Sequence, residues 1–83
     1  MVYELTKHAQ DMIDEREIPL SLIERVLDCP ELIIPDRDDA QLEHRLKIIP
    51  ELENRVLRVL INPKAVPIKI ITLYFDRTMR GKL

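Results

Sequence analysis

The spacing of apolar residues changes at Pro30, and no other feature of the chain constrains the fold as strongly. Before Pro30, apolar residues recur at intervals of three and four, the period of a helix with one buried side. After Pro30, apolar and polar residues alternate, the period of a strand with one wet face. Helices followed by strands predict an α+β fold, in which two N-terminal helices pack on one face of an antiparallel meander sheet of three to four strands.

Two helices are predicted before Pro30. Thr6 is a good N-cap for a first helix over residues 6–17, because its hydroxyl can accept a hydrogen bond from a free amide of the first turn. Proline disfavours helical geometry in the residue before it but fits the first turn of a helix. Pro19 therefore closes the first helix, and a second helix runs from Pro19 or Leu20 to about Cys29.

Four segments after Pro30 have strand patterns, and a fifth, optional one stands at the N-terminus. They are residues 32–34, 41–49, 55–61 and 68–75, with 2–5 as the optional front strand. Turns rich in proline and acidic residues separate them, and a polar, basic tail follows the last strand. We expect residues 1–83 to form a single domain, since a chain of this length suits one small core.

Alternation along a strand assigns each residue to one of two faces. The residues expected to face the helices are Leu57, Val59, Ile61, Ile71, Leu73 and Phe75. The polar sides of the strands then predict one open, basic face on the sheet. Its members are Arg45, Lys47, Arg58, Thr72 and Tyr74, with Arg77 and Arg80 nearby in the tail.

Charge is divided between the two halves of the chain. Residues 1–44 carry four Lys/Arg against twelve Asp/Glu, a net charge of −8, and residues 45–83 carry nine against three, a net charge of +6. The overall charge of −2 hides this division. Such segregation is typical of a protein that offers one face to itself and another to a partner.

Composition disfavours several classes of protein. No apolar run approaches the roughly 18–20 residues that cross a bilayer, and the N-terminus lacks a signal-peptide pattern, so we expect a cytoplasmic location and no membrane partner. The single Cys29 cannot form an internal disulfide and is expected to be a small buried residue. With only His8 and His44 beside it, no metal site is expected, and nothing indicates a cofactor.

Three polar residues have structural interpretations. His8 lies at the margin of the apolar stripe of the first helix, where a ring nitrogen commonly bonds to the chain. His44 alternates with Leu42 and Leu46 and is expected to point to the apolar side of its strand. Arg16 continues the apolar stripe and is expected to tie the helix to a carboxylate or a carbonyl.

A basic face with an aromatic residue suits the phosphate backbone and a stacked base of RNA. The alternative is a solvated face, because most exposed charge serves only solubility. If the protein is an enzyme, cleavage of RNA without a metal needs a base, cations and an acid. The base would be His8 or His44, Tyr74 would stack or donate, and the cations would be Arg45, Arg58, Arg77 and Arg80.

The segment TKHAQDMIDEREIP, followed by a short helix that ends before Pro30, resembles an uncharacterised prokaryotic family of small domains with the hallmark H-A-x-x-M-x-x-R-x-I. The matching residues are His8, Ala9 and Met12, with Arg16 and Ile18 each one position later. The family typically has glycine where this chain has Glu17. The terminal IKIITLYFDRTMR also resembles its last strand, with Thr72 and Tyr74 in place.

This resemblance covers nearly the whole chain and relates it to the RelE/ParE and BrnT toxin folds. It implies two helices packed on an antiparallel sheet. The wider group includes ribonucleases that cut messenger RNA, gyrase poisons and many members without a demonstrated activity. A helical antitoxin commonly wraps such toxins, so the resemblance also implies an antitoxin-like partner.

Two functions from different classes are therefore expected. The first is a toxin-like domain that cleaves or binds RNA as one component of a toxin–antitoxin-type pair; as an enzyme it would be a metal-independent endoribonuclease. The alternative is a non-enzymatic interaction module, in which the basic face or an edge strand docks an antitoxin-like partner or a second copy in a homodimer. A third interpretation makes the charge purely internal, with helix carboxylates paired to arginines at the sheet edge.

Overall fold

Both predicted helices form, and Thr6 fixes the start of the first. The computed structural model describes residues 2–83, with α1 over Lys7–Arg16 and α2 over Leu20–Asp28. The Thr6 hydroxyl accepts a hydrogen bond from a first-turn amide of α1 at 3.1 Å and donates to the Ile71 carbonyl at 2.8 Å. One side chain thus caps the helix and ties it to the sheet.

Glu17 ends α1 in a left-handed conformation, with a φ angle of 53°. Glycine adopts this conformation without strain and is the common residue at such a helix end. Glu17 therefore stands at a position where glycine would be free of this backbone strain. Pro19 follows in an extended conformation and precedes the first turn of α2, so the two helices are joined by a short, stiff connection.

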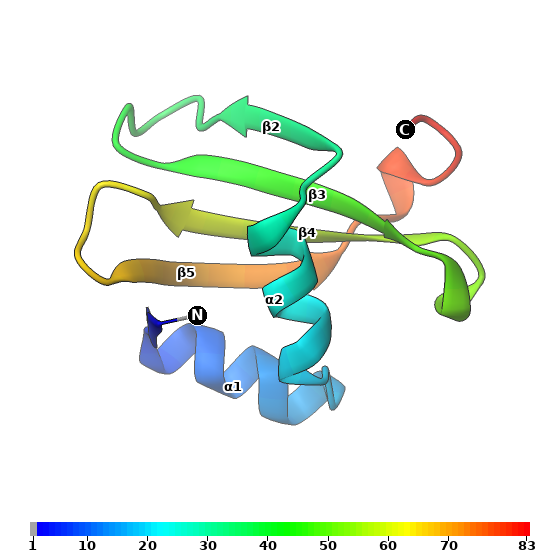
Figure 1. Cartoon of the computed structure of the whole chain (residues 1–83), viewed down its shortest axis with the longest axis horizontal. Coiled ribbons are helices and arrows are strands. Elements are labelled where there is room, and N and C mark those ends of the chain that lie inside the picture. Colours follow the sequence, from blue (N-terminus) through cyan, green and yellow to red (C-terminus); the bar gives the residue numbers. More distant parts are fainter. Residues whose placement is uncertain (1) are drawn as a thin grey trace.

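The sheet has five strands in the order β1-β5-β4-β3-β2 (Figure 1). Their bounds are Tyr3–Leu5 for β1, Leu32–Pro35 for β2, Glu43–Ile49 for β3, Arg55–Asn62 for β4 and Ile68–Phe75 for β5. The last four form the predicted antiparallel meander, whereas β1 pairs with β5 in parallel. The predicted sheet of three to four antiparallel strands is thus corrected to a mixed sheet of five, because the N-terminal segment completes the β5 edge.

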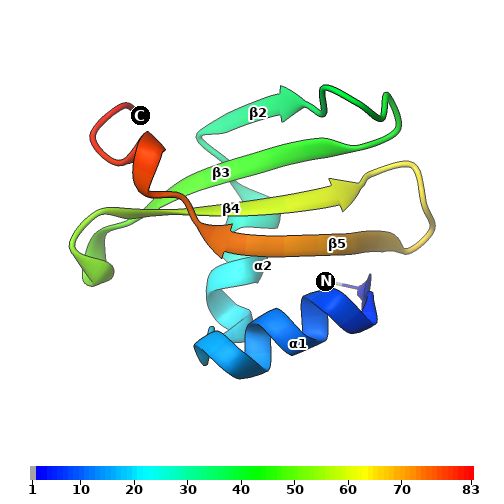
Figure 2. The ribbon, with the colours of Figure 1, turned by 180° about the vertical axis from the view of Figure 1, so that it is seen from behind.

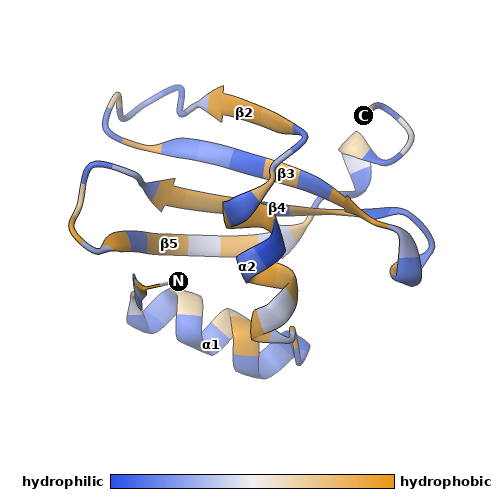
Figure 3. Ribbon diagram, viewed as in Figure 1, coloured by the Kyte–Doolittle hydropathy of each residue, from blue (hydrophilic) through white to orange (hydrophobic). Residues whose placement is uncertain are grey.

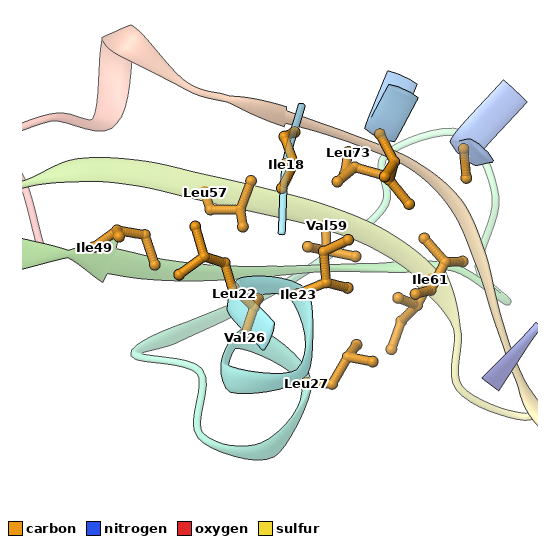
Figure 4. Close-up of a cluster of buried hydrophobic side chains, with 13 residues drawn as sticks. Ile18, Leu22, Ile23, Val26, Leu27, Ile49, Leu57, Val59, Ile61 and Leu73 are labelled. Carbon is orange, nitrogen blue, oxygen red and sulfur yellow. The ribbon is translucent and has the colours of Figure 1, made fainter. Parts of the chain in front are cut away.

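Both helices cover the same face of the sheet, as predicted (Figures 1 and 2). α1 packs mainly on β5, and α2 packs on β3 and β4. Strands β4 and β5 are hydrophobic along much of their length, whereas the connecting loops are hydrophilic (Figure 3). In the core, Leu22 and Val26 of α2 lie against Leu57 and Val59 of β4 (Figure 4).

The core-facing residues of β4 are those predicted, but one position of β5 differs. The register between the two strands shifts at Leu60/Ile61, so that Ile61 pairs with Ile70 and Leu60 with Thr72. Ile71 is the extra residue of this bulge, and a bulge moves the following alternation by one. Ile70 therefore takes the fully buried place that was predicted for Ile71.

The predicted face assignment of β3 is wrong. Arg45 pairs with Val59 and Lys47 with Leu57, and directly opposed residues of an antiparallel pair point to the same face. Val59 and Leu57 belong to the core beneath the helices. Arg45 and Lys47 therefore lie on the helix side, not on the open face with Arg58.

The C-terminal end of α2 explains why cations occupy this side. The Arg45 guanidinium donates to the Leu27 carbonyl at 3.0 Å, and the Lys47 ammonium donates to the Cys29 carbonyl at 2.9 Å. Carbonyl groups at a helix end lack helical partners, and the helix dipole favours positive charge there. Cys29, predicted to be buried, is exposed at this helix end.

The face opposite the helices is partly covered by the C-terminal segment. After β5 the chain turns onto this face and forms η2, a single 3-10 turn over Arg77–Met79 (Figure 2). On this face Leu46 and Val56 are almost fully buried, although neither belongs to the core that packs against the helices. No helix among residues 2–83 is long and apolar enough to cross a membrane.

Candidate functional site

A chain of polar contacts crosses the face opposite the helices. We call it the open-face network; its members are Asp36, His44, Arg58, Asp76 and Thr78. Asp36 Oδ1 lies 2.8 Å from His44 Nε2, and His44 Nδ1 lies 3.3 Å from an Arg58 terminal nitrogen. Asp76 then lies 2.9 Å from Arg58 Nε. The network joins the β2–β3 loop to the segment after β5.

Hydrogen-bond chemistry assigns the protons of His44. An arginine has only donors, so His44 Nδ1 must be the acceptor in its contact with Arg58. Nε2 then carries the proton and donates it to Asp36. His44 is therefore held as the neutral Nε2–H tautomer, and its Nδ1 lone pair faces a cation.

Both carboxylates of the network are stabilised in their charged form. A hydrogen bond from His44, with help from nearby backbone amides, holds the pKa of Asp36 below its ordinary value. The Thr78 hydroxyl, which donates to Asp76 at 2.6 Å, contributes most to a lowered pKa of Asp76, with Arg58 adding to it. The Arg58 Nε–H is close to Asp76 but not aimed at it, and it is left without a hydrogen bond.

A basic hollow adjoins this network at Asp76. We call it the C-terminal hollow; it has a volume of about 600 Å³ and is lined by Arg55, Val56, Phe75, Asp76, Arg77 and Arg80. Neither Arg55 nor Arg77 forms an ion pair with any of residues 2–83. Arg80 lies 3.8 Å from the exposed Glu53 carboxylate and donates to the Glu53 carbonyl at 2.6 Å. Asp76 is already engaged by Arg58 and Thr78. The hollow therefore offers positive charge that the rest of the chain does not neutralise.

A second hollow lies on the other side of Arg55 and Phe75. We call it the junction hollow, because the α1–α2 connection forms one of its walls. Its volume is about 460 Å³, and it shares Arg55 and Phe75 with the C-terminal hollow. The Arg55 guanidinium lies 4.0 Å above the centre of the Phe75 ring, a cation–π contact that holds it between the two hollows.

The structure divides the residues that were predicted to bind a nucleic acid or a partner. Arg77 and Arg80 line the C-terminal hollow, as two neighbouring cations. Arg58 lies on the open face, where it belongs to the network. Arg45 and Lys47 lie on the helix side and are engaged by carbonyls of α2, so the predicted grouping of all five cations is wrong.

The residues that were predicted to be catalytic also separate. His8 is exposed on α1, whose buried residues pack on the opposite side of the sheet from His44. His44 lies on the open face, not on the core side of its strand, because its partner Leu60 points away from the helices. Tyr74 lies opposite Arg58 on that face and is partly exposed. His44 and Tyr74 are therefore on one face, and His8 is not.

Several residues of the site were missed from the sequence, and one was assigned a structural role that it does not have. Asp36 and Asp76 stand in polar turn segments, where the sequence pattern indicates only a loop. Arg55 alternates with Leu57, a signal that it points to the core side at the very end of β4. Arg16 was predicted to be partly covered and tied to an acceptor, but it is exposed, has no such partner among residues 2–83, and lines the junction hollow.

Fold and site together define a small α+β domain whose two helices cover one face of a mixed five-stranded sheet, with a cationic hollow where β4 begins and β5 ends. The chain belongs to the family described as a domain of unknown function, DUF4258, which matches residues 5–75. No curated protein and no solved structure shows significant similarity to it. Among residues 2–83, no group of three or more His, Cys, Asp or Glu side chains is arranged to hold a metal ion.

Proposed function

We propose that this protein is a toxin-like domain that binds RNA and cleaves it without a metal, as one component of a toxin–antitoxin-type pair. This proposal includes the relation to the RelE/ParE toxins that the helix motif implies, and the cytoplasmic location of such pairs. The single observation that carries it is the C-terminal hollow. Three arginines gather around Phe75 there, and only one of them has a carboxylate neighbour, the exposed Glu53.

The chemistry of the hollow suits RNA better than an acidic protein. Arginine binds phosphate through two parallel hydrogen bonds, and release of counterions from the phosphate backbone supplies most of the affinity. An aromatic ring with a guanidinium above it is also a platform for an unstacked base. The overall charge of −2 does not oppose this, because the acidic residues are concentrated in residues 1–44 and the hollow is built mainly from residues 55–80.

The open-face network, which meets that hollow at Asp76, supplies groups for cleavage. In the proposed step, the ribose 2′-hydroxyl takes the place of Arg58 at His44 Nδ1 and transfers its proton there. The 2′-oxygen attacks phosphorus while the bond to the 5′-oxygen breaks, and the Tyr74 phenol protonates that leaving oxygen. The displaced Arg58 guanidinium moves to the phosphate and neutralises the charge of the pentavalent transition state. The products are a 2′,3′-cyclic phosphate and a free 5′-hydroxyl.

Incubation of single-stranded RNA with the purified protein and a metal chelator tests this step. We expect cyclic-phosphate products from the wild-type protein, a loss of about 10²–10⁴-fold in rate for His44→Ala, and a smaller loss for Tyr74→Phe. His8→Ala is the matched histidine control and should cleave like the wild type. Intact RNA with the wild-type protein, or equal loss for both histidine variants, would contradict the proposed chemistry.

One observation favours the second candidate, a non-enzymatic interaction module. β2 is an edge strand of four residues, and its Ile33 is 50% exposed. An exposed edge can pair with a strand of an antitoxin-like partner or of a second copy. Size-exclusion chromatography at two concentrations, alone and with the product of a neighbouring gene, should show a complex that Ile33→Lys weakens. A chain that remains monomeric in every mixture would exclude this role.

A further inference from the structure

We infer that the junction hollow receives an unpaired base of the RNA whose phosphates lie in the C-terminal hollow, so that the protein selects single-stranded over double-stranded RNA. This inference rests on the proposed binding of RNA, but it does not require cleavage. It concerns a different hollow, with a different lining, and it assigns a role to Arg55 and Phe75 that phosphate binding alone does not need.

The two hollows form one continuous surface, because the same two side chains line both of them. Arg55 stands above the Phe75 ring at 4.0 Å and so presents its guanidinium between the hollows. A nucleotide joins a phosphate to a base through a single ribose. A chain whose phosphate lies against Arg77 and Arg80 therefore has its neighbouring base directed across Arg55, toward the junction hollow.

The lining of the junction hollow matches a base and not a second phosphate. Its floor includes the buried Ile18 and Leu22, and Leu52 packs against the same core. Apolar contact suits the flat faces of a base, which carry no charge. A volume of about 460 Å³ lies within the roughly 300–1,000 Å³ of sites for small organic groups.

Polar groups at the rim suit the hydrogen-bonding edge of a base. Glu51 is paired with Arg25, whose hydrogen bonds lower the pKa of Glu51 to about 2, so this carboxylate is ionised at neutral pH. Arg16, Glu17 and Ser21 complete the rim with donors and acceptors. The mixture of both signs of charge disfavours a phosphate here, whereas a base offers donors and acceptors together.

Selection of single strands follows from geometry. The bases of a duplex are stacked and paired inside the helix, and a base must leave the stack before it can enter a hollow on a protein. A single strand meets this requirement at little cost. Double-stranded RNA could still reach Arg77 and Arg80 with its backbone, but it would leave the junction hollow empty.

Binding of three RNA probes of equal length to the wild-type protein tests the inference by fluorescence anisotropy. The probes are a single strand, the same strand with its central nucleotides made abasic, and a duplex. We expect the abasic strand and the duplex to bind about tenfold more weakly than the single strand, since base contacts are worth about that much or more. Ser21→Trp, which fills the junction hollow from an exposed helix position, should weaken only the intact single strand, and Ser21→Ala should not.

The outcomes separate the two proposals. If all three probes bind equally and Arg77→Ala/Arg80→Ala weakens all of them, phosphate binding stands and the base-binding role of the junction hollow is wrong. If none of the probes binds, the proposed function itself is wrong. The abasic comparison uses only the wild-type protein, so it decides the question even if Ser21→Trp unfolds in a urea titration.

Discussion

Two groups of cations from the same basic half of the chain have opposite surroundings. Arg45, Lys47 and Arg58 lie within hydrogen-bond distance of carbonyls or carboxylates and are less than one quarter exposed. We call these the engaged cations. Arg55, Arg77 and Arg80, the open cations, line the C-terminal hollow and are exposed; Arg80 donates to the carbonyl of the exposed Glu53 at 2.6 Å but remains half exposed.

The difference shows that the position of hydrogen-bond acceptors, and not the charge itself, decides whether a cation becomes part of the fold or stays exposed. α2 ends above β3 and needs donors for its last carbonyls, so cations of β3 become part of the fold. At the far end of β4 and β5 the last turn of α1 lies near Arg55, but among residues 2–83 neither its carbonyls nor the carboxylates of Glu15 and Glu17 bind a cation of the C-terminal hollow. The cations there remain available to a ligand.

Among the engaged cations, Arg58 is expected to contribute most to the free energy of unfolding. Arg58→Ala removes an engaged cation and leaves Asp76, a carboxylate that is 8% exposed, without its ion pair. We expect the free energy of unfolding to fall by about 2–4 kcal/mol, because a covered charge without a partner is costly. Urea denaturation measures this loss. A change below about 0.5 kcal/mol, the usual range of surface substitutions, would mean that Arg58 is not engaged in solution.

Arg45 gives the next largest effect. Arg45→Ala leaves the Leu27 carbonyl and the Glu43 carboxylate without their donor. We expect a loss of about 1–3 kcal/mol in the free energy of unfolding, the cost of an unsatisfied, partly buried acceptor. Arg45→Lys keeps the charge but lacks the fork that reaches both acceptors, so it should recover only part of this loss.

Acidification should lower the free energy of unfolding, because the carboxylates of the open-face network lose their charge. The folded-state pKa values of Asp36 and Asp76 are lowered, so these carboxylates stabilise the fold above their ordinary pKa near 3.8 and lose that contribution as the pH falls below it. Urea midpoints measured from pH 7 down to pH 3 should therefore fall in the acid range. Asp76→Asn should be less stable at pH 7 and should show a flatter acid limb; an acid limb as steep as that of the wild type would contradict the assigned role of Asp76.

Glu17 allows a test of the backbone at the α1–α2 connection, which forms a wall of the junction hollow next to the open cation Arg55. Glu17→Gly relieves the left-handed conformation and removes a carboxylate beside the exposed Arg16. We expect the free energy of unfolding to rise by about 0.5–1 kcal/mol, which urea denaturation measures. Glu17→Ala removes the same charge without relieving the backbone. It should not raise the midpoint of urea denaturation, and a rise equal to that of Glu17→Gly would contradict the assigned backbone effect.

The smallest effect on stability is expected for an open cation. Arg77→Ala removes a side chain that has no ion pair among residues 2–83 and should change the free energy of unfolding by less than about 0.5 kcal/mol. The same urea titration that is used for Arg45→Ala measures it. A loss as large as that of Arg45→Ala would show that the two groups of cations do not differ.

The sequence predicts the helices and strands well, but it predicts less well the face of the sheet on which each strand residue lies. Caps at Thr6 and Pro19 and the alternation of β4 are local signals, so the helix ends and the core residues Leu57 and Val59 follow from them directly. The five-stranded, mixed character of the sheet does not. The pairing of β1 with β5 joins segments more than sixty residues apart, which no local pattern encodes.

The errors at the site have the same origin. In β3 the apolar alternation predicts that Leu46 faces the helices, but Leu46 is buried on the opposite face of the sheet, and the helix side holds cations that bind carbonyls at the end of α2. The bulge beside Ile61 likewise depends on the partner strand. Arg77 and Arg80 line one hollow because both stand in the short segment after β5, although they were predicted as neighbours of the larger basic face.

Anisotropy titrations of labelled single-stranded RNA across a range of salt test most directly whether the open cations form a binding site. For Arg77→Ala/Arg80→Ala we predict affinity at least about tenfold below wild type and a salt slope reduced by about 1 for each lost contact. Lys64→Ala/Lys69→Ala removes the same charge from the opposite end of β5 and should bind within about threefold of wild type. Equal loss for the two pairs would mean that the hollow is no site and that only overall charge attracts the RNA.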